Sequence, residues 1–138
     1  MCSFFTFFML YLIYLEMEVI VLGKKYKNEN QIILPRMLEI YKPVDFDWMH
    51  TSITKDSIFT IHHIKERNCG GDTDLDNCAL LLKKSHRLLN MLESKDYDLY
   101  FAWNELFMDI NVCKCPPTDE YVKEMILLRK KTMHVLYK

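Results

Sequence analysis

The sequence predicts an α+β fold in which two short strands are followed by a mostly helical C-terminal part. The first observation is a run of β-branched and aromatic residues at 57–64, which favours a strand. The second is the apolar run Cys78–Leu82, and the third is a set of helix-forming patterns from Lys83 onward. A strand, a glycine-bearing loop, a strand and a helix at 83–92 therefore follow one another.

Length and charge restrict the class of protein. The chain has 138 residues, half of them hydrophobic, which is enough to bury the core of one domain. A formal net charge of -1 provides no overall basic field, so a nucleic-acid partner would need a local basic patch. No internal repeat or linker divides the sequence, so residues 17–138 are expected to form a single domain with its motif at 58–92.

The cysteines indicate a reducing compartment. There are five, an odd number without regular spacing, as in reduced thiols of a cytoplasmic protein. Cys113 and Cys115 are separated by one residue, whereas zinc ribbons usually separate paired ligands by two or more. No structural zinc is expected.

The first 16 residues form an apolar segment with two open interpretations. The run at 4–15 is shorter than the roughly 20 residues of a membrane helix, and Glu16 and Glu18 end it. It also lacks the basic start of a signal peptide, so no stable membrane insertion is expected. Either the protein begins at Met9 or Met17, or the segment is a helix or strand that docks on the domain.

Between this segment and the first motif strand, three elements are expected. Residues 17–23 are β-branched and predict a strand, and residues 24–31 predict a polar loop. Pro35 suits the first position of a short helix at 36–42, which Pro43 would end.

Two helices are expected near the C-terminus. The helix at Asp119–Leu136 has Thr118 as a fair N-cap, acidic residues in its first turn and basic residues late. The other covers 97–110, and these residues are expected on one side of it: Tyr97, Tyr100, Phe101, Asn104 and Phe107.

The loop and helix of the motif carry groups that can build a cation site. Gly70 and Gly71 allow a tight reversal, and the Asn77 amide can tie loop backbone groups together. His86 and Asn90 are four residues apart, so they share one face of the predicted helix. Imidazole and amide ligands suit a divalent ion that keeps some waters.

The segments "IHHI", "GGDTDLDN", "CALLL" and "SHRLLN" resemble, in this order, the HNH or ββα-metal endonucleases. The resemblance covers less than a quarter of the chain and implies a ββα-metal motif packed with additional helices. It implies that His62 is a metal ligand, that His63 is the general base that activates water, and that Asn77 pins the loop. It also implies that His86 is a metal ligand and that Asn90 is a second helix ligand or a phosphate contact.

The resemblance further implies an enzyme that hydrolyses phosphodiester bonds of nucleic acid. DNA is the expected substrate, with RNA as the alternative. The ion expected is a single Mg²⁺, with Mn²⁺, Ni²⁺ or Zn²⁺ as alternatives, and the products would carry a 5'-phosphate. Phage, mobile-element and defence settings all fit, and the helices beyond Tyr97 would buttress the site or form a homodimer. Five basic residues around the motif are candidate contacts to flanking phosphates: Lys65, Arg67, Lys83, Lys84 and Arg87.

Three points stay open. Adjacent residues of an ideal strand point to opposite faces, so His62 and His63 can serve one site only if the strand ends or bends there. A catalytically silent nucleic-acid-binding module of the same fold is an alternative, although it would not need His63. A membrane-tethered interaction protein that uses the N-terminal apolar run is another.

Overall fold

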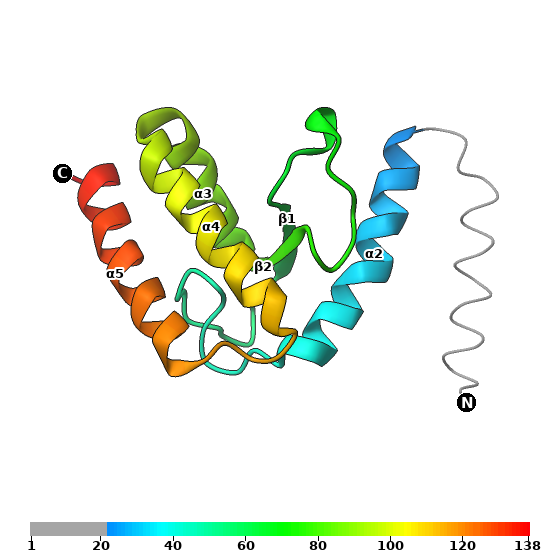
Figure 1. Ribbon diagram of the computed structural model, residues 1–138, viewed down its shortest axis with the longest axis horizontal. Helices are drawn as coiled ribbons and strands as arrows, with labels where there is room; N and C mark the ends of the chain where they lie inside the picture. The colour runs from blue at the N-terminus through cyan, green and yellow to red at the C-terminus, as the bar shows by residue number, and fades with distance from the viewer. Residues whose placement is uncertain (1–21) are drawn as a thin grey trace.

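The structure is a computed structural model that describes residues 22–138. The apolar run at 4–15 and most of the strand expected at 17–23 lie outside these residues. The elements, drawn in Figure 1, are α2 (Leu22–Tyr41), β1 (Phe59–His63), the short 3-10 helix η1 (Arg67–Cys69), β2 (Cys78–Leu82), α3 (Lys83–Lys95), α4 (Tyr97–Cys113) and α5 (Asp119–Leu136).

A two-stranded antiparallel hairpin lies at the centre of the fold. Phe59 of β1 lies opposite Leu82 of β2, and His63 lies opposite Cys78. Every residue of β2 is buried, and α3 begins directly after it and contacts both strands. Figure 1 shows α2 on one side of the hairpin and α3, α4 and α5 on the other. The predicted α+β fold, with a ββα unit and additional helices, is confirmed.

The connection between α2 and β1 closes the core. Trp48 is fully buried, with its ring centre 4.8 Å from that of Tyr41 and 6.0 Å from that of Phe107. The neighbouring Asp47 carboxylate is also buried, and it accepts hydrogen bonds from three backbone N–H groups, those of Met49, Thr51 and Leu82, at 3.0, 2.8 and 2.8 Å. Because Leu82 ends β2, this carboxylate fastens the connection to the hairpin.

Helix α2 corrects three expectations. Residues 24–31 are helical, so the polar loop expected there is wrong, and the helix expected to begin at Pro35 is the second half of one longer helix. The strand expected to end at Gly23 is also wrong at Leu22 and Gly23, which belong to α2. Ile33, Met37 and Tyr41 are buried at intervals of four residues, and this tertiary packing overrides the weak local preference.

The C-terminal helices follow the sequence more closely. Helix α5 has the expected bounds, and the Thr118 side chain accepts a hydrogen bond from the backbone of Tyr121 at 3.4 Å. Helix α4 extends beyond 110, and its expected apolar side is partly wrong, because Tyr97 and Phe101 are 60% and 50% exposed. Trp103 is fully buried instead, since α4 contacts both α3 and α5.

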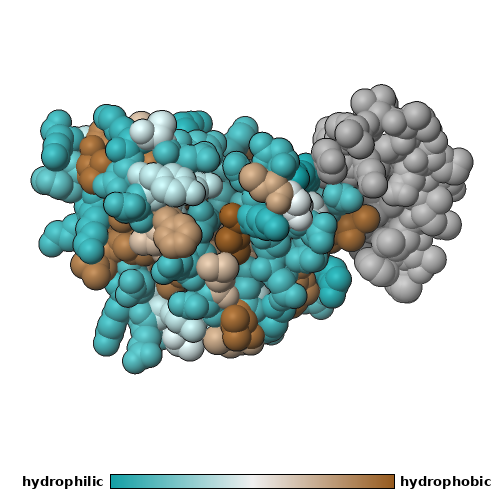
Figure 2. Space-filling view, turned by 45° about the horizontal axis from the view of Figure 1, so that its top comes forward, coloured by the Kyte–Doolittle hydropathy of each residue, from teal (hydrophilic) through white to brown (hydrophobic). Residues whose placement is uncertain are grey.

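Within residues 22–138, no helix combines the length and apolar character needed to cross a bilayer. The face in Figure 2 is mostly hydrophilic, and its hydrophobic side chains are scattered rather than gathered in one broad patch. The four cysteines that the structure describes are free thiols.

Candidate functional site

Two histidine rings, those of His62 on β1 and His86 on α3, lie in contact, and His63 follows at the end of β1. His62 is 5% exposed and lies in contact with α4, whereas His63, the last residue of β1, is half-buried beside the following loop. The rings of His62 and His86 lie edge to face with their centres 5.5 Å apart. The strand thus ends at the second histidine, which is the condition under which both neighbours can serve one site.

His62 is fixed by an amide from α4. Its Nε2 lies 2.8 Å from Oδ1 of Asn104, and the rings of Tyr100 and Phe107 lie edge-on at 6.3 and 5.9 Å. An amide oxygen only accepts, so the proton of neutral His62 is on Nε2 and the lone pair is on Nδ1. Burial lowers the pKa of His62 to about 4, against the opposing effect of the Asn104 hydrogen bond. The ring is therefore neutral at pH 7.

His86 is fixed by a hydroxyl from β1. Its Nδ1 lies 3.0 Å from Oγ1 of Thr60, and this hydroxyl donates its own proton to the Leu81 carbonyl at 3.0 Å. The hydroxyl must then accept from Nδ1–H, which leaves the lone pair of His86 on Nε2. Burial lowers the pKa of His86, so this imidazole is also neutral near pH 7.

The spacing of the two ring centres is compatible with a shared divalent ion. Imidazole must be neutral to bind a metal, and both rings are. With N–metal distances of about 2.1 Å, two imidazoles on one ion have ring centres about 5 Å apart, close to the 5.5 Å observed. No group of three or more His, Cys, Asp and Glu side chains gathers within the part of the chain that the structure describes. Further ligands would be oxygens, such as the exposed amide of Asn90 on α3, water or substrate.

His63 belongs to a second hydrogen-bonded set. Its Nε2 lies 2.8 Å from Oγ1 of Thr73, and Arg67 donates to the same hydroxyl at 3.2 Å. The Thr73 proton can then point at Nε2, and in that arrangement Nε2 carries the lone pair. Burial, the positive charge of Arg67 and His86 lower the pKa of His63, while the charge of Glu29 raises it. His63 is held in the form that accepts a proton.

Asn77 sets the shape of the loop between the strands. Its Oδ1 accepts from the Lys65 backbone at 2.8 Å, and its Nδ2 donates to the carbonyls of Lys65 and Asp72 at 2.9 and 2.8 Å. Gly71 lies so close that a Cβ there would collide with the Lys65 carbonyl and the Asn77 amide. These contacts hold Thr73 and Arg67 beside His63.

The five basic candidates fall into two groups. Lys83, Lys84 and Arg87 are exposed on the first turns of α3 and make no ion pair with the described residues; Lys65 is likewise exposed, on the loop. Arg67 is half-buried and also donates to Oδ1 of Asn30 in α2 at 2.8 Å. The first group faces solvent, whereas Arg67 joins α2 to the loop that holds His63.

The sequence alone did not identify the three groups that orient the histidines. Asn104 carried a usable signal, because a buried amide among aromatic residues normally has a specific partner. Thr60 and Thr73 carried none, since threonine is common in strands and loops.

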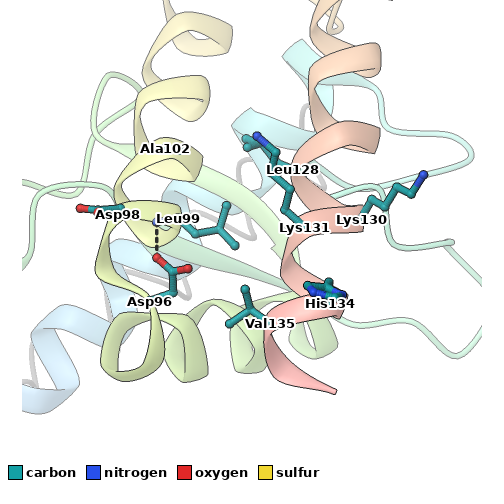
Figure 3. A pocket seen from close by; sticks show the side chains of 9 residues that line it. All are labelled: Asp96, Asp98, Leu99, Ala102, Leu128, Lys130, Lys131, His134 and Val135. Atoms are coloured by element: carbon teal, nitrogen blue, oxygen red, sulfur yellow. Dashed lines mark hydrogen bonds between the residues drawn. The ribbon is translucent and has the colours of Figure 1, made fainter. Parts of the chain in front are cut away.

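A different cavity, of about 750 Å³, lies between α4 and α5. Figure 3 shows His134 and Lys130 on α5 and, across the cavity, the Asp96 carboxylate bonded to the backbone of Leu99. Asp96 caps α4 there. His134 is the one histidine in its lining, so the cavity lacks the paired imidazoles of the site above.

Comparison with known proteins locates one similarity. A family model of HNH endonucleases matches residues 50–90. No curated protein and no solved structure matches the chain. The matched residues span the hairpin, its loop and α3 as far as Asn90, and they include His62, His63, Asn77, His86 and Asn90.

Proposed function

We propose that this protein is a metal-dependent endonuclease that hydrolyses phosphodiester bonds in DNA. The premise is the match of its residues 50–90 to the HNH endonuclease family. The observation that carries the proposal is the pair His62 of β1 and His86 of α3, whose ring centres are 5.5 Å apart and whose pKa values are lowered, together with His63 at the end of β1.

His62, His86 and Asn90 would hold the metal ion. When bound, a divalent ion such as Mg²⁺ neutralises the phosphate and stabilises charge on the leaving oxygen. His62 would offer Nδ1 and His86 would offer Nε2, because Asn104 and Thr60 engage the other ring nitrogens. Such outer partners orient ligands and typically change metal affinity 10- to 100-fold when removed, as a rough guide.

His63 would act as the general base. Its Nε2 lies 2.8 Å from the Thr73 hydroxyl, and a water that displaces this hydroxyl would give its proton to the same nitrogen. The lowered pKa keeps Nε2 unprotonated near pH 7. Arg67, which shares Thr73 with His63, would stabilise negative charge on the reacting phosphate.

Exposed cations would position the strand. Lys83, Lys84 and Arg87 follow β2 directly on α3, the helix that carries His86. Contacts from such residues to backbone phosphates fix orientation without reading sequence. They would supply the local basic patch that the net charge of -1 does not.

The test is incubation of the purified protein with plasmid DNA and Mg²⁺, Mn²⁺ or Ni²⁺, with and without chelator. We expect nicking or linearisation that the chelator abolishes and that His63→Ala reduces. His134→Ala is the matched control, because His134 is exposed on α5 and should leave the rate unchanged. DNA binding without cleavage under all three metals would instead indicate a silent binding module.

A further inference from the structure

A basic cavity of about 710 Å³ lies beside the start of α3. Its walls come from the connection between α2 and β1, from the beginning of α3 and from α5. Four basic side chains and one acidic side chain, Asp56, line it. The residues that matter for its chemistry are Phe46, His50, Lys83, Lys84, Arg87 and Arg129.

The walls of this cavity are fixed to one another. Arg129 of α5 donates from Nη1 to the Met49 carbonyl at 3.2 Å and to the Thr51 hydroxyl at 2.6 Å. The Thr51 hydroxyl is also hydrogen-bonded to the Ser85 hydroxyl of α3, at 2.6 Å. Three segments far apart in the sequence thus meet in one network. A charged ligand would find Arg129 and the cavity wall already held in place, which reduces the entropy lost on binding.

An aromatic pair lies at the same cavity. The rings of Phe46 and His50 stack with centres 3.8 Å apart and planes 12° from parallel, and Phe46 is 40% exposed. His50 adopts the left-handed backbone conformation, with φ of 62°, which places its ring over Phe46. The Asp47 carboxylate holds the turn by its hydrogen bonds to Met49 and Thr51. The result is a flat, partly exposed aromatic surface next to free cations.

Helix α3 links the cavity to the histidine site. Lys83 precedes His86 by three residues, about 5 Å along the helix axis, and Arg87 follows it directly. One strand of nucleic acid could therefore contact both places.

We propose that this cavity is a nucleotide subsite, in which Lys84 and Arg87 bind a backbone phosphate and Phe46 stacks on the adjacent base. The subsite rests on the proposed nuclease function. Phosphate-binding cations beside an exposed aromatic ring are the combination by which proteins hold single-stranded nucleic acid. A base inside a duplex is not free to stack on a side chain, so the substrate class is nucleic acid with an unpaired segment beside the cleaved bond. Phe46 and Arg129 both lie outside the matched residues 50–90.

The test measures binding of labelled oligonucleotides by fluorescence anisotropy in the presence of chelator, so that no strand is cut. Phe46→Ala should weaken binding of a single strand or an overhang about tenfold and leave a blunt duplex unchanged, because only an unpaired base can stack. Phe46→Trp should retain binding of the single strand. Lys84→Glu combined with Arg87→Glu should weaken binding of both substrates and reduce the salt dependence.

The matched control is Lys130→Glu combined with Lys131→Glu, two exposed lysines of α5 that line the other cavity (Figure 3). Equal losses in this control, equal effects of Phe46→Ala on single strand and duplex, or no binding of nucleic acid by the unaltered protein would overturn the subsite. The two proposals fail separately. Cleavage that is unaffected by Phe46→Ala refutes the subsite alone, whereas selective binding without cleavage under any metal refutes the nuclease alone.

Discussion

At the scale of single residues, the site depends on which nitrogen each histidine presents. Thr60 and Asn104 each engage one ring nitrogen, and each leaves the other nitrogen with its lone pair. Thr60 lies within the matched residues 50–90 and Asn104 lies outside them, on α4. The helices beyond the motif therefore contribute to the proposed metal centre as well as to the core.

Thr60→Val keeps the shape of the side chain but removes the hydroxyl that accepts from Nδ1–H of His86. His86 can then adopt the other tautomer, so we expect affinity for Mn²⁺ to fall about 10- to 100-fold with little loss of stability. Titration calorimetry on the metal-free protein measures this. Thr54→Val, at an exposed threonine, should bind Mn²⁺ normally. An unchanged affinity in Thr60→Val would show that the hydroxyl does not orient the ligand.

Asn104→Leu leaves the buried Nε2–H of His62 without its acceptor. The free energy of unfolding should fall by about 1–3 kcal/mol, and metal affinity should fall with it, because the ring is free to turn. Asn111→Leu is the matched control on the same helix, since Asn111 is buried and bonded to Tyr41 and to the Cys78 carbonyl. It should lose similar stability in a urea titration while retaining metal affinity. If both variants bound metal normally, Asn104 would be a core residue only.

At the scale of elements, helices and strands with strong local signals were predictable. The bounds of β2 and α5 follow from an unbroken apolar run and from a capped, charge-polarised helix. The polar half of α2 was not predictable, because its helical state depends on contacts with distant residues, such as the hydrogen bond between Asn30 and Arg67. For the same reason the sequence indicated the histidines and Asn77 but not the partners that orient them. Those partners lie up to 42 positions away.

Pro35 lies inside α2 and is exposed. It cannot donate a backbone hydrogen bond and crowds the preceding turn, so Pro35→Ala should relieve a local cost. The loss of a rigid residue from the unfolded chain offsets part of this gain. We expect the free energy of unfolding to rise by about 1–2 kcal/mol, as measured by urea titration, with Arg36→Ala as the neighbouring control. A loss of stability would mean that Pro35 is needed for Ile33 and Met37 to pack.

At the scale of the whole molecule, four histidines with lowered pKa values link folding to pH, namely His50, His62, His63 and His86. His62 has the ordinary pKa of 6.5 in the unfolded chain and about 4 in the fold. Between these values the unfolded chain binds a proton that the folded chain does not, so stability is present above pH 6.5 and is lost as the pH falls toward 4. The full loss from this residue is about 3 kcal/mol.

Urea unfolding of the metal-free protein at several pH values between 7.5 and 4 measures this linkage. His62→Gln should remove the largest part of the pH dependence, because no other histidine is as buried. His134→Gln, at an exposed side chain of α5, is the control for the substitution itself. A pH dependence that survives His62→Gln in full would contradict the proposed neutral state of His62.

The central claim is that His62 holds the metal while its neighbour His63 accepts the proton of water. The most direct measurement compares His62→Ala with His63→Ala for Mn²⁺ affinity, DNA affinity and cleavage rate. We predict that His63→Ala keeps both affinities while cleavage falls roughly 10²- to 10⁴-fold, the usual contribution of a positioned general base. His62→Ala should lose metal affinity and rate together. If His63→Ala lost the metal and His62→Ala kept it, the roles would be exchanged, and if both variants cut DNA at the original rate, this site would not be the active site.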